Sequence, residues 1–337
     1  MRILYGAGNR VGANSQLCRF LEALNDKHTV KLAAYVRSSY SLPHIDWTLN
    51  ALHHNPVAKK KSREIHALFG YHGAPLINFQ GAGTLLKEAR AFEPDLVISD
   101  GCDVIAHIAK ALNVRLWYCS PIHLLDGVQW EDSQLRYTAV LNKARSFLLR
   151  LPEPEKKLVY SPFGDIRFRP ALNTGYEWIT PYYVPADAAC TKSIAVVNDN
   201  ERFSELSKIL NGSSVSSLFS PFKEEFANLK TYLSTHKKEY IAALNNSIAV
   251  FSTGETSYIA DAFYSKHNIC VAPALNDLEA LLNAILVREY SLGTDVHQVE
   301  LMERFALDEL EKGLSRMPRQ DYLSLLGSPQ LHELCDI

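Results

Sequence analysis

Residues 254–257 have the types and the position needed to bind an anion. They follow an apolar segment that reads as a strand and precede a segment with helical spacing. The start of a helix presents free N–H groups and partial positive charge, which attract phosphate. A glycine permits close approach, and two hydroxyl groups add donors. We therefore predict that Gly254, Glu255, Thr256 and Ser257 form an anion site, with an ordinary helix N-cap as the alternative.

Two aspartates near residue 100 are candidates for a general base. Asp100 ends a predicted buried strand over residues 94–100, and Asp103 lies in the turn that follows. Parallel α/β sheets bind ligands beyond the carboxyl ends of their strands. Burial at such a place raises the pKa of a carboxylate and favours its use as a base near neutral pH. Asp103 also precedes a predicted helix over residues 104–112, so helix capping is its alternative role.

Polar residues at other strand and helix ends extend the predicted binding site. Asn198 follows the predicted strand 192–197, and Asp277 and Glu279 lie at the start of the predicted helix 278–287. Their side chains can accept hydrogen bonds from hydroxyl groups, although the helix dipole alone also favours acidic residues at helix starts. Four basic residues are candidates to neutralise a bound anion: Arg167, Arg169, Lys192 and Arg202.

The first half of the chain contributes a glycine loop, a histidine and a basic run. The loop after the first predicted strand contains Gly8, Asn9, Gly12 and Asn14, and His123 follows a later predicted strand. The basic run consists of Lys59, Lys60, Lys61 and Arg63. Such a run is typical of a solvated surface but also suits a polyanionic partner such as nucleic acid. The net charge of -2 gives the whole chain no general attraction to nucleic acid.

The elements that must position these residues alternate between strands and helices. Residues 2–5, 15–24 and 28–36 predict a strand, a helix and a second strand, which open a doubly wound parallel sheet. The same rhythm continues to residue 119 and starts again at residue 192. Residues 37–80 are predicted as an inserted loop-and-helix region, and the proline-rich residues 152–185 as the end of the first domain plus the linker. In the second half, residues 222–235 are predicted as a helix.

Length and rhythm together predict two domains. A chain of 337 residues is longer than one ordinary hydrophobic core requires. We predict an α/β protein with two Rossmann-like, doubly wound domains that face a cleft, over residues 1–175 and 176–315. Residues 316–337 are predicted as a tail that packs back. The cleft between such domains is the default place for a ligand.

Composition restricts the class of protein further. The apolar runs are strand-length, far shorter than the roughly 20 residues of a membrane span. The first residues read as a strand rather than as a signal peptide, so we expect a cytoplasmic protein. The six cysteines are dispersed without a Cys-x-x-Cys pair, which predicts reduced thiols rather than a zinc or redox site.

Four segments, in order along the chain, resemble the GT-B superfamily of nucleotide-sugar glycosyltransferases: residues 1–24, 93–120, 175–181 and 251–293. The last is the most specific, with a glycine-and-threonine turn before a helix and a later Asn-Ala pair at residues 283–284. Two positions depart from the family's pattern. Ala13 or Asn14 stands where many members have a Gly-His pair whose histidine acts as a base. Glu279 is followed by Ala280, where the family often has glutamine.

The resemblance implies an enzyme that transfers a sugar from a nucleotide-diphosphate sugar, with a UDP-sugar favoured, to a hydroxyl group. It implies no metal ion and no cofactor beyond this co-substrate. It also places the donor on the second domain, with the candidates from Asn198 to Glu279, and the acceptor on the first domain, with the glycine loop, His123 and the basic run.

The nature of the acceptor and several other functions remain open from the sequence. Phage-type members of the superfamily glycosylate hydroxylated DNA bases. The basic run and the aromatic side chains of Trp47, Phe69 and Tyr71 make double-stranded DNA a candidate acceptor, in the host cytoplasm for a phage-encoded chain. A small molecule, a glycan or a lipid carrier is the competing class of acceptor.

Three functions without such an acceptor are also considered. A GT-B-like nucleotide-sugar epimerase needs the same donor and no acceptor, and a non-catalytic binder needs the donor alone. An NAD-dependent oxidoreductase would need an acidic residue at the end of the second strand, and residues 34–38 contain none.

Overall fold

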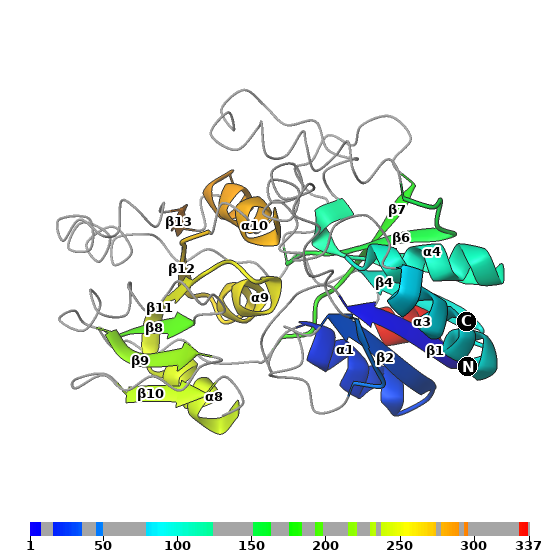
Figure 1. Ribbon diagram of the computed structural model, residues 1–337. Coiled ribbons are helices and arrows are strands. Elements are labelled where there is room, and N and C mark those ends of the chain that lie inside the picture. Colours follow the sequence, from blue (N-terminus) through cyan, green and yellow to red (C-terminus); the bar gives the residue numbers. More distant parts are fainter. Residues whose placement is uncertain are drawn as a thin grey trace, which may run out of the picture.

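Two α/β domains lie side by side in the computed structural model, each built on one parallel sheet (Figure 1). The structure describes residues 1–7, 16–35, 45–49, 79–123, 151–162, 175–183, 193–197, 215–220, 230–233, 237–273, 278–289, 293–295 and 330–335.

The first sheet has seven parallel strands in the order β3-β2-β1-β4-β5-β6-β7. The chain builds it outward from β1 to one edge and then from β4 to the other, which is the doubly wound arrangement predicted from the sequence. The strands are β1 (Arg2–Ala7), β2 (Thr29–Tyr35), β3 (Trp47–Leu49), β4 (Leu96–Asp100), β5 (Arg115–Cys119), β6 (Lys156–Tyr160) and β7 (Tyr176–Ile179).

Alternate side chains of the central strands bury against helices on opposite faces of this sheet. Tyr5 packs in one core cluster with the apolar side of α1 (Gln16–Asn25). Its neighbour Leu4 packs in another cluster with α3 (Phe79–Phe92) and α4 (Asp103–Leu112). Because successive side chains of a strand point to opposite faces, an almost continuous apolar strand is covered on both sides.

The first sheet reaches past the boundary that we expected at residue 175. The prolines of residues 152–185 predicted the end of the first domain plus a linker, and β6 and β7 both lie within this segment and pair in parallel. The expected start of the second domain is therefore an edge strand of the first. The prolines flank these strands, where no N–H group is needed for the sheet, so they do not prevent pairing.

The second sheet has six parallel strands in the order β10-β9-β8-β11-β12-β13. Its strands are β8 (Ser193–Val197), β9 (Val215–Ser220), β10 (Lys230–Leu233), β11 (Ser247–Ser252), β12 (Asn268–Val271) and β13 (Gly293–Asp295). Its described helices are α8 (Lys237–Asn245), α9 (Thr256–Tyr264) and α10 (Leu278–Glu289). The helix predicted over residues 222–235 is wrong at its end, where β10 pairs with β9.

The two domains meet through an apolar and aromatic surface. Val159 of β6 is buried in the core cluster of the second domain, and Tyr176 and Trp178 of β7 pack against that cluster. Tyr183 stacks on Tyr264 at the end of α9, with ring centroids 4.2 Å apart. The edge of the first sheet therefore covers helices of the second domain.

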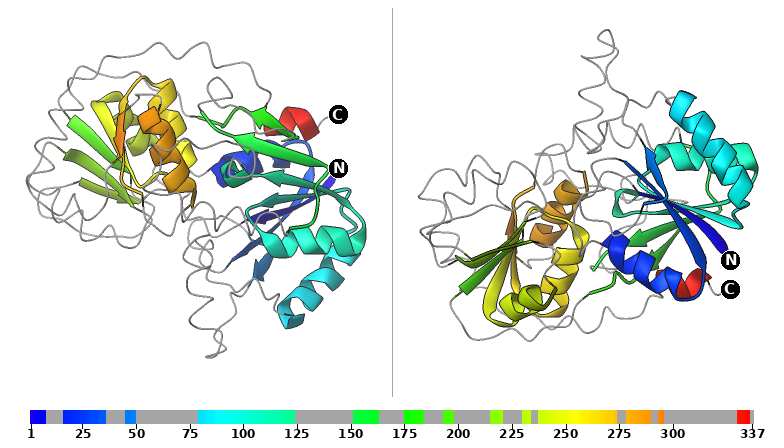
Figure 2. Two further views of the ribbon diagram at one scale, coloured as in Figure 1. Left: turned by 90° about the horizontal axis from the view of Figure 1, so that it is seen from above. Right: turned by 60° about the horizontal axis from the view of Figure 1, so that its bottom comes forward.

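The helix α13 (Leu331–Cys335) returns to the first domain. Leu331 and Cys335 are buried in the same core cluster as α1. Both ends of the chain accordingly lie at the first domain (Figure 2). This helix belongs to the segment that the sequence analysis assigned to a tail.

The five cysteines that the structure describes are free thiols, and each is buried: Cys18, Cys102, Cys119, Cys270 and Cys335. Burial raises the pKa of the Cys102 thiol well above its ordinary value. Within the described ranges, no helix has the length and apolar character to cross a membrane.

The close contact between β1 and α4 gives a prediction about Gly6. A Cβ atom on Gly6 would lie 2.4 Å from Cγ1 and 2.6 Å from Cβ of Ile105. We expect Gly6→Ala to lower the free energy of unfolding by about 1–3 kcal/mol, because the helix must move away from the sheet. Urea denaturation measures the change.

Gly83 in α3 provides the matched control for this substitution. A Cβ atom there meets no atom within 4 Å. Alanine is the better helix former, so Gly83→Ala should stabilise the protein by up to about 1 kcal/mol. Equal effects of the two substitutions would show that the predicted contact with Ile105 is absent.

Candidate functional site

The candidate site lies where the strand order of each sheet reverses. In the first sheet this switch point separates β1 from β4, and in the second sheet it separates β8 from β11. Ligands of open α/β sheets bind beyond the carboxyl ends of strands at such points. Asp100 is the last residue of β4, and Gly254 follows β11. Two of the regions predicted from the sequence therefore occupy the two switch points.

The turn into α9 is held tightly against α10. Gly254 has a φ of 108°, and a Cβ atom on it would lie 2.7 Å from the Cα atom of Ala280. Asn283 Nδ2 donates to the backbone oxygen of Gly254 at 2.7 Å and to Oγ1 of Thr256 at 2.9 Å. Glycine is thus required here both for its conformation and for the close approach of the backbone to α10.

Glu279 occupies the first N–H group of α9. Its Oε1 accepts the hydrogen bond from the backbone N–H of Thr256 at 2.9 Å. The sequence suggested that Glu279 binds donor hydroxyl groups. In this structure one of its oxygens caps the neighbouring helix, where a carboxylate also interacts favourably with the helix dipole. The role of Glu279 toward a donor stays a prediction.

Glu255 lies between the starts of two helices from different domains. Its Oε1 accepts from the backbone N–H of Gln16, the first residue of α1, at 3.3 Å. Its Oε2 accepts a hydrogen bond from the hydroxyl of Ser257. The N-termini of α1 and α9 therefore converge, and a buried carboxylate lies at their meeting point. The N–H groups at the two helix starts carry partial positive charge, which would attract a phosphate as it attracts the Glu255 carboxylate.

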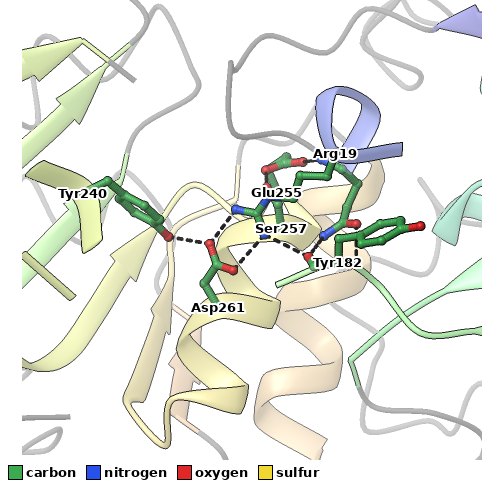
Figure 3. A network of polar contacts seen from close by, with 7 residues as sticks. Arg19, Tyr182, Tyr240, Glu255, Ser257 and Asp261 are labelled. Atoms are coloured by element: carbon green, nitrogen blue, oxygen red, sulfur yellow. Dashed lines mark hydrogen bonds and ion pairs between the residues drawn. The ribbon is translucent and has the colours of Figure 1, made fainter. Parts of the chain in front are cut away.

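A buried ion pair joins the same two helices a little further along (Figure 3). Arg19 of α1 donates from Nη1 and Nη2 to the two carboxylate oxygens of Asp261 in α9, each at 2.7 Å. The side chains are 11% and 0% exposed. Burial alone would lower the pKa of the Arg19 guanidinium, but its ion pair and hydrogen bonds with Asp261 hold that pKa above its ordinary value.

The ion pair is extended by three further residues. Tyr240 of α8 donates its hydroxyl to Asp261 Oδ2 at 2.8 Å. Arg19 Nη1 also donates to the backbone oxygen of Tyr182 at 2.8 Å. Gln16 makes two hydrogen bonds to the backbone of Tyr182: its Nε2 donates to the Tyr182 oxygen and its Oε1 accepts from the Tyr182 N–H. Figure 3 shows the side chains of both domains pointing into one polar cluster.

Sequence reasoning missed this cluster. The available signal was the single charged residue of α9. Eight of the nine residues of α9 are buried, and Asp261 is the one with a charged side chain. Buried charges are normally paired, so a partner was implied, but its position depends on how the domains pack.

Asp100 is buried on the α1 face of the first sheet. Its Oδ2 accepts from the hydroxyl of Tyr5 at 3.2 Å, and its Oδ1 accepts from the hydroxyl of Tyr160 at 3.2 Å. Tyr160 in turn packs edge-to-face on Phe20 of α1. The carboxylate is therefore held by hydroxyl groups from two strands, on the face of the sheet that α1 covers.

Asp103 and His123 lie on different elements of the first domain. Asp103 begins α4, where its Oδ1 accepts from the N–H of Val104 at 2.9 Å, as expected for a residue at a helix start. His123 is buried in a short 3-10 turn, Pro121–His123, and its ring stacks on that of Tyr118 with the ring centroids 4.7 Å apart. This turn contacts α10 of the second domain.

The remaining predicted site residues lie outside the described residues: Gly8, Asn9, Gly12, Asn14, Lys59, Lys60, Lys61, Arg63, Arg167, Arg169, Lys192, Asn198, Arg202 and Asp277. Their roles stay predictions, as does the expected independence of metal ions. Among the residues that the structure describes, no three His, Cys, Asp or Glu side chains gather as a metal site.

Comparison with known proteins identifies the family. The model of glycosyl transferase family 1 matches residues 1–318. Among solved structures, the SsfS6 glycosyltransferase of Streptomyces sp. SF2575 has 14% identity and a TM-score of 0.58, with 100% of each chain covered. The spinosyn rhamnosyltransferase SpnG has 12% identity and a TM-score of 0.63, with 100% of this chain and 98% of that chain covered. A search of curated protein sequences finds no significant match. The family match and the two doubly wound domains show that this chain belongs to glycosyl transferase family 1 and is a glycosyltransferase of the GT-B type.

Proposed function

We propose that this enzyme transfers a sugar from a pyrimidine nucleoside diphosphate sugar to a hydroxyl group of a small-molecule acceptor. The observation that carries the proposal is the turn at Gly254, which brings the start of α9 to the switch point of the second sheet and against the start of α1. Such a helix start attracts the diphosphate of the donor. The acceptor then lies on the side of the first domain.

The nucleotide of the donor is proposed from two sources. The sequence resemblance favours a UDP-sugar. Structures similar to this one include SsfS6 complexed with thymidine diphosphate, at 15% identity and a TM-score of 0.60, covering 100% of this chain and 99% of that chain. Uracil and thymine present the same ring edge for hydrogen bonds, so UDP-sugars and TDP-sugars are the first donors to test.

A small-molecule acceptor is favoured over DNA. SpnG is similar to this chain and has also been solved with the spinosyn aglycone, a small molecule. The DNA alternative depends on the basic run at residues 59–63, which lies outside the described residues. It therefore stays a prediction from the sequence alone.

Asp100 is the proposed base for the acceptor, with Asp103 as the alternative. In the transfer step the acceptor oxygen attacks the anomeric carbon, its proton passes to the base, and the bond from that carbon to the diphosphate oxygen breaks. Asp100 ends β4 at the switch point, and the two tyrosines that donate to it belong to the core cluster that includes α1. Asp103 already has a helix-start contact. Asp100 is thus the better placed carboxylate.

Thermal unfolding with a panel of nucleotides tests the donor site. UDP, TDP, GDP and their sugars are compared with NAD and NADP. A nucleotide that binds and is present at about 100-fold its dissociation constant adds about 2.7 kcal/mol to the free energy of unfolding. We expect stabilisation by UDP or TDP and none by NAD or NADP. Stabilisation by NADP alone, or by no nucleotide, would contradict the proposed donor site.

Product analysis then separates transfer from the remaining functions. Incubation with the stabilising nucleotide sugar and a mixture of hydroxyl acceptors should release the nucleoside diphosphate and form a glycoside. Conversion of the sugar without an acceptor would indicate an epimerase, and binding without turnover would indicate a non-catalytic binder. Modified double-stranded DNA is included as a competing acceptor, and its exclusive use would overturn the small-molecule proposal.

A further inference from the structure

We propose that Arg19 and Asp261 are positioning residues that fix the first domain on the second in the arrangement needed for sugar transfer. The inference rests on the proposed function for its catalytic consequence. Its structural content, which is that this pair sets the register between α1 and α9, stands independently.

The geometry of the pair is directional. Both guanidinium nitrogens of Arg19 face both oxygens of Asp261, so the contact fixes the orientation of the two helices as well as their distance. The carboxylate is fixed from its own domain by Tyr240, and the guanidinium is fixed by the peptide oxygen of Tyr182. Neither charge can move alone without losing buried hydrogen bonds.

The apolar contacts between the domains lack this directionality, and the one other directional contact described above, the hydrogen bond from the Gln16 N–H to Glu255, is a single bond at 3.3 Å. Val159, Trp178 and the stack of Tyr183 on Tyr264 bury apolar area, which resists separation but permits sliding. Three further ion pairs join residues within the first domain: Arg2–Glu93, Arg115–Glu155 and Lys156–Glu177. The Arg19–Asp261 pair therefore provides the register that the apolar surface does not.

The pair lies close to the proposed base and to the proposed diphosphate site. One turn before Arg19, the N–H of Gln16 contacts Glu255 in the turn that precedes α9. The same helix α1 covers Tyr160, which holds Asp100. A shift of α1 along α9 would thus change the distance between the proposed base and the proposed diphosphate site. Misplacement by about 1 Å is sufficient to lower a reaction rate about 100-fold.

The decisive variant replaces the polar cluster with apolar groups of similar size. It combines Arg19→Met, Asp261→Leu and Tyr240→Phe, so that both charges of the pair and the tyrosine hydroxyl that donates to Asp261 are removed together, and the Tyr182 oxygen keeps its bond from Gln16. Buried ion pairs exchanged in this way often leave stability unchanged or increase it. We expect a melting temperature within about 5 °C of the wild type, nucleotide affinity within about threefold, and kcat lower by about 100-fold.

Two companion variants control for the chemistry and for general effects. Arg19→Lys keeps the positive charge but loses the planar guanidinium that donates to both oxygens of Asp261, and we expect kcat to fall by about tenfold. Arg115→Gln combined with Glu155→Gln removes an ion pair of the first domain whose side chains are 50% and 42% exposed. An exposed ion pair contributes little to stability, so this variant should keep kcat within about twofold of the wild type.

A distance measurement between the domains tests the structural content without any activity. Spin labels are attached through cysteines introduced at the exposed Lys110 of α4 and Lys238 of α8. Five native cysteines are buried, and Cys190 is first replaced by serine. We expect one narrow distance distribution in the wild type and a broader or shifted one in the apolar variant.

The two measurements separate failure of this inference from failure of the proposed function. A wild-type distance distribution in the apolar variant would overturn the role of the pair in setting register, whatever the enzyme transfers. A broadened distribution with unchanged kcat would overturn its importance for catalysis. An inactive wild type with every nucleotide sugar would count against the proposed function, while the distance comparison would still decide the structural claim.

Discussion

Gly254→Ala is expected to lower the free energy of unfolding by about 2–5 kcal/mol, the sum of overpacking and backbone strain. The new Cβ atom would lie 2.7 Å from Cα and 2.8 Å from Cβ of Ala280, and 3.0 Å from Cγ1 of Val271. The first of these is a backbone atom of α10, so no side-chain rotation relieves the contact. The φ of 108° adds strain because residues with a Cβ atom rarely adopt it.

The substitution should also weaken nucleotide binding. Moving the turn away from α10 breaks the bond from Asn283 to the Gly254 oxygen and the bond from the Thr256 N–H to Glu279. Both bonds fix the start of α9, where we place the diphosphate. We expect the dissociation constant for UDP or TDP to rise about tenfold or more, which corresponds to a loss of about 1.4 kcal/mol. Isothermal titration calorimetry measures this constant.

Gly175 is the matched control for Gly254. It also has a positive φ, 55°, but a Cβ atom on it would meet no atom within 4 Å. Gly175→Ala therefore reports the cost of the backbone conformation alone, about 1–2 kcal/mol. Urea denaturation compares the two variants. If they lose the same free energy, the close contact of Gly254 with α10 has no energetic weight.

The doubly wound arrangement could be predicted because the central strands carry their own signal. β4 and β11 are continuous apolar runs, and such runs indicate strands buried on both faces. The two switch points then follow from the doubly wound rule, which is why Asp100 and residues 254–257 were correctly placed at strand ends.

The edges of the sheets could not be predicted in the same way. β7 has only four residues, among prolines, and β10 has four residues within a segment that also fits a helix. For such short segments the pairing partner decides the structure, and local propensity has little weight. β10 is a strand because it pairs with β9, which no local pattern of residues 222–235 reveals.

The contacts within the site were less predictable than its location. Thr256 and Ser257 were correctly located at the start of a helix that follows a strand, and Glu279 at the start of another helix, but the hydrogen bond between the Thr256 N–H and Glu279 depends on how α9 packs on α10. Arg19 has no special position in the sequence of α1. Its partner Asp261 is 242 residues away along the chain, so only the packing of the domains reveals the pair.

Asp100→Asn is expected to lower kcat by about 100-fold or more while the protein stays folded. A general base contributes typically 10²- to about 10⁴-fold to a rate, and an amide cannot take the proton of the acceptor hydroxyl. Asparagine has nearly the same shape as aspartate and keeps one oxygen to accept a bond from Tyr5 or Tyr160. The affinity for UDP or TDP should stay unchanged, because the donor is proposed to bind to the second domain. Steady-state kinetics with saturating donor, together with calorimetry, measures both quantities.

The two tyrosines decide whether this loss reflects proton transfer or lost structure. Tyr5→Phe combined with Tyr160→Phe removes both hydroxyl groups that donate to Asp100 but leaves its carboxylate in place. If Asp100 takes the proton, this double variant loses stability, since each lost buried hydrogen bond contributes about 1 kcal/mol, but retains far more activity than Asp100→Asn. If both variants lose activity equally, Asp100 serves to hold β1 and β6 together, and Asp103→Asn becomes the variant that should abolish transfer. An active Asp100→Asn enzyme would remove Asp100 from the chemistry altogether, because no amide can replace a carboxylate as a base.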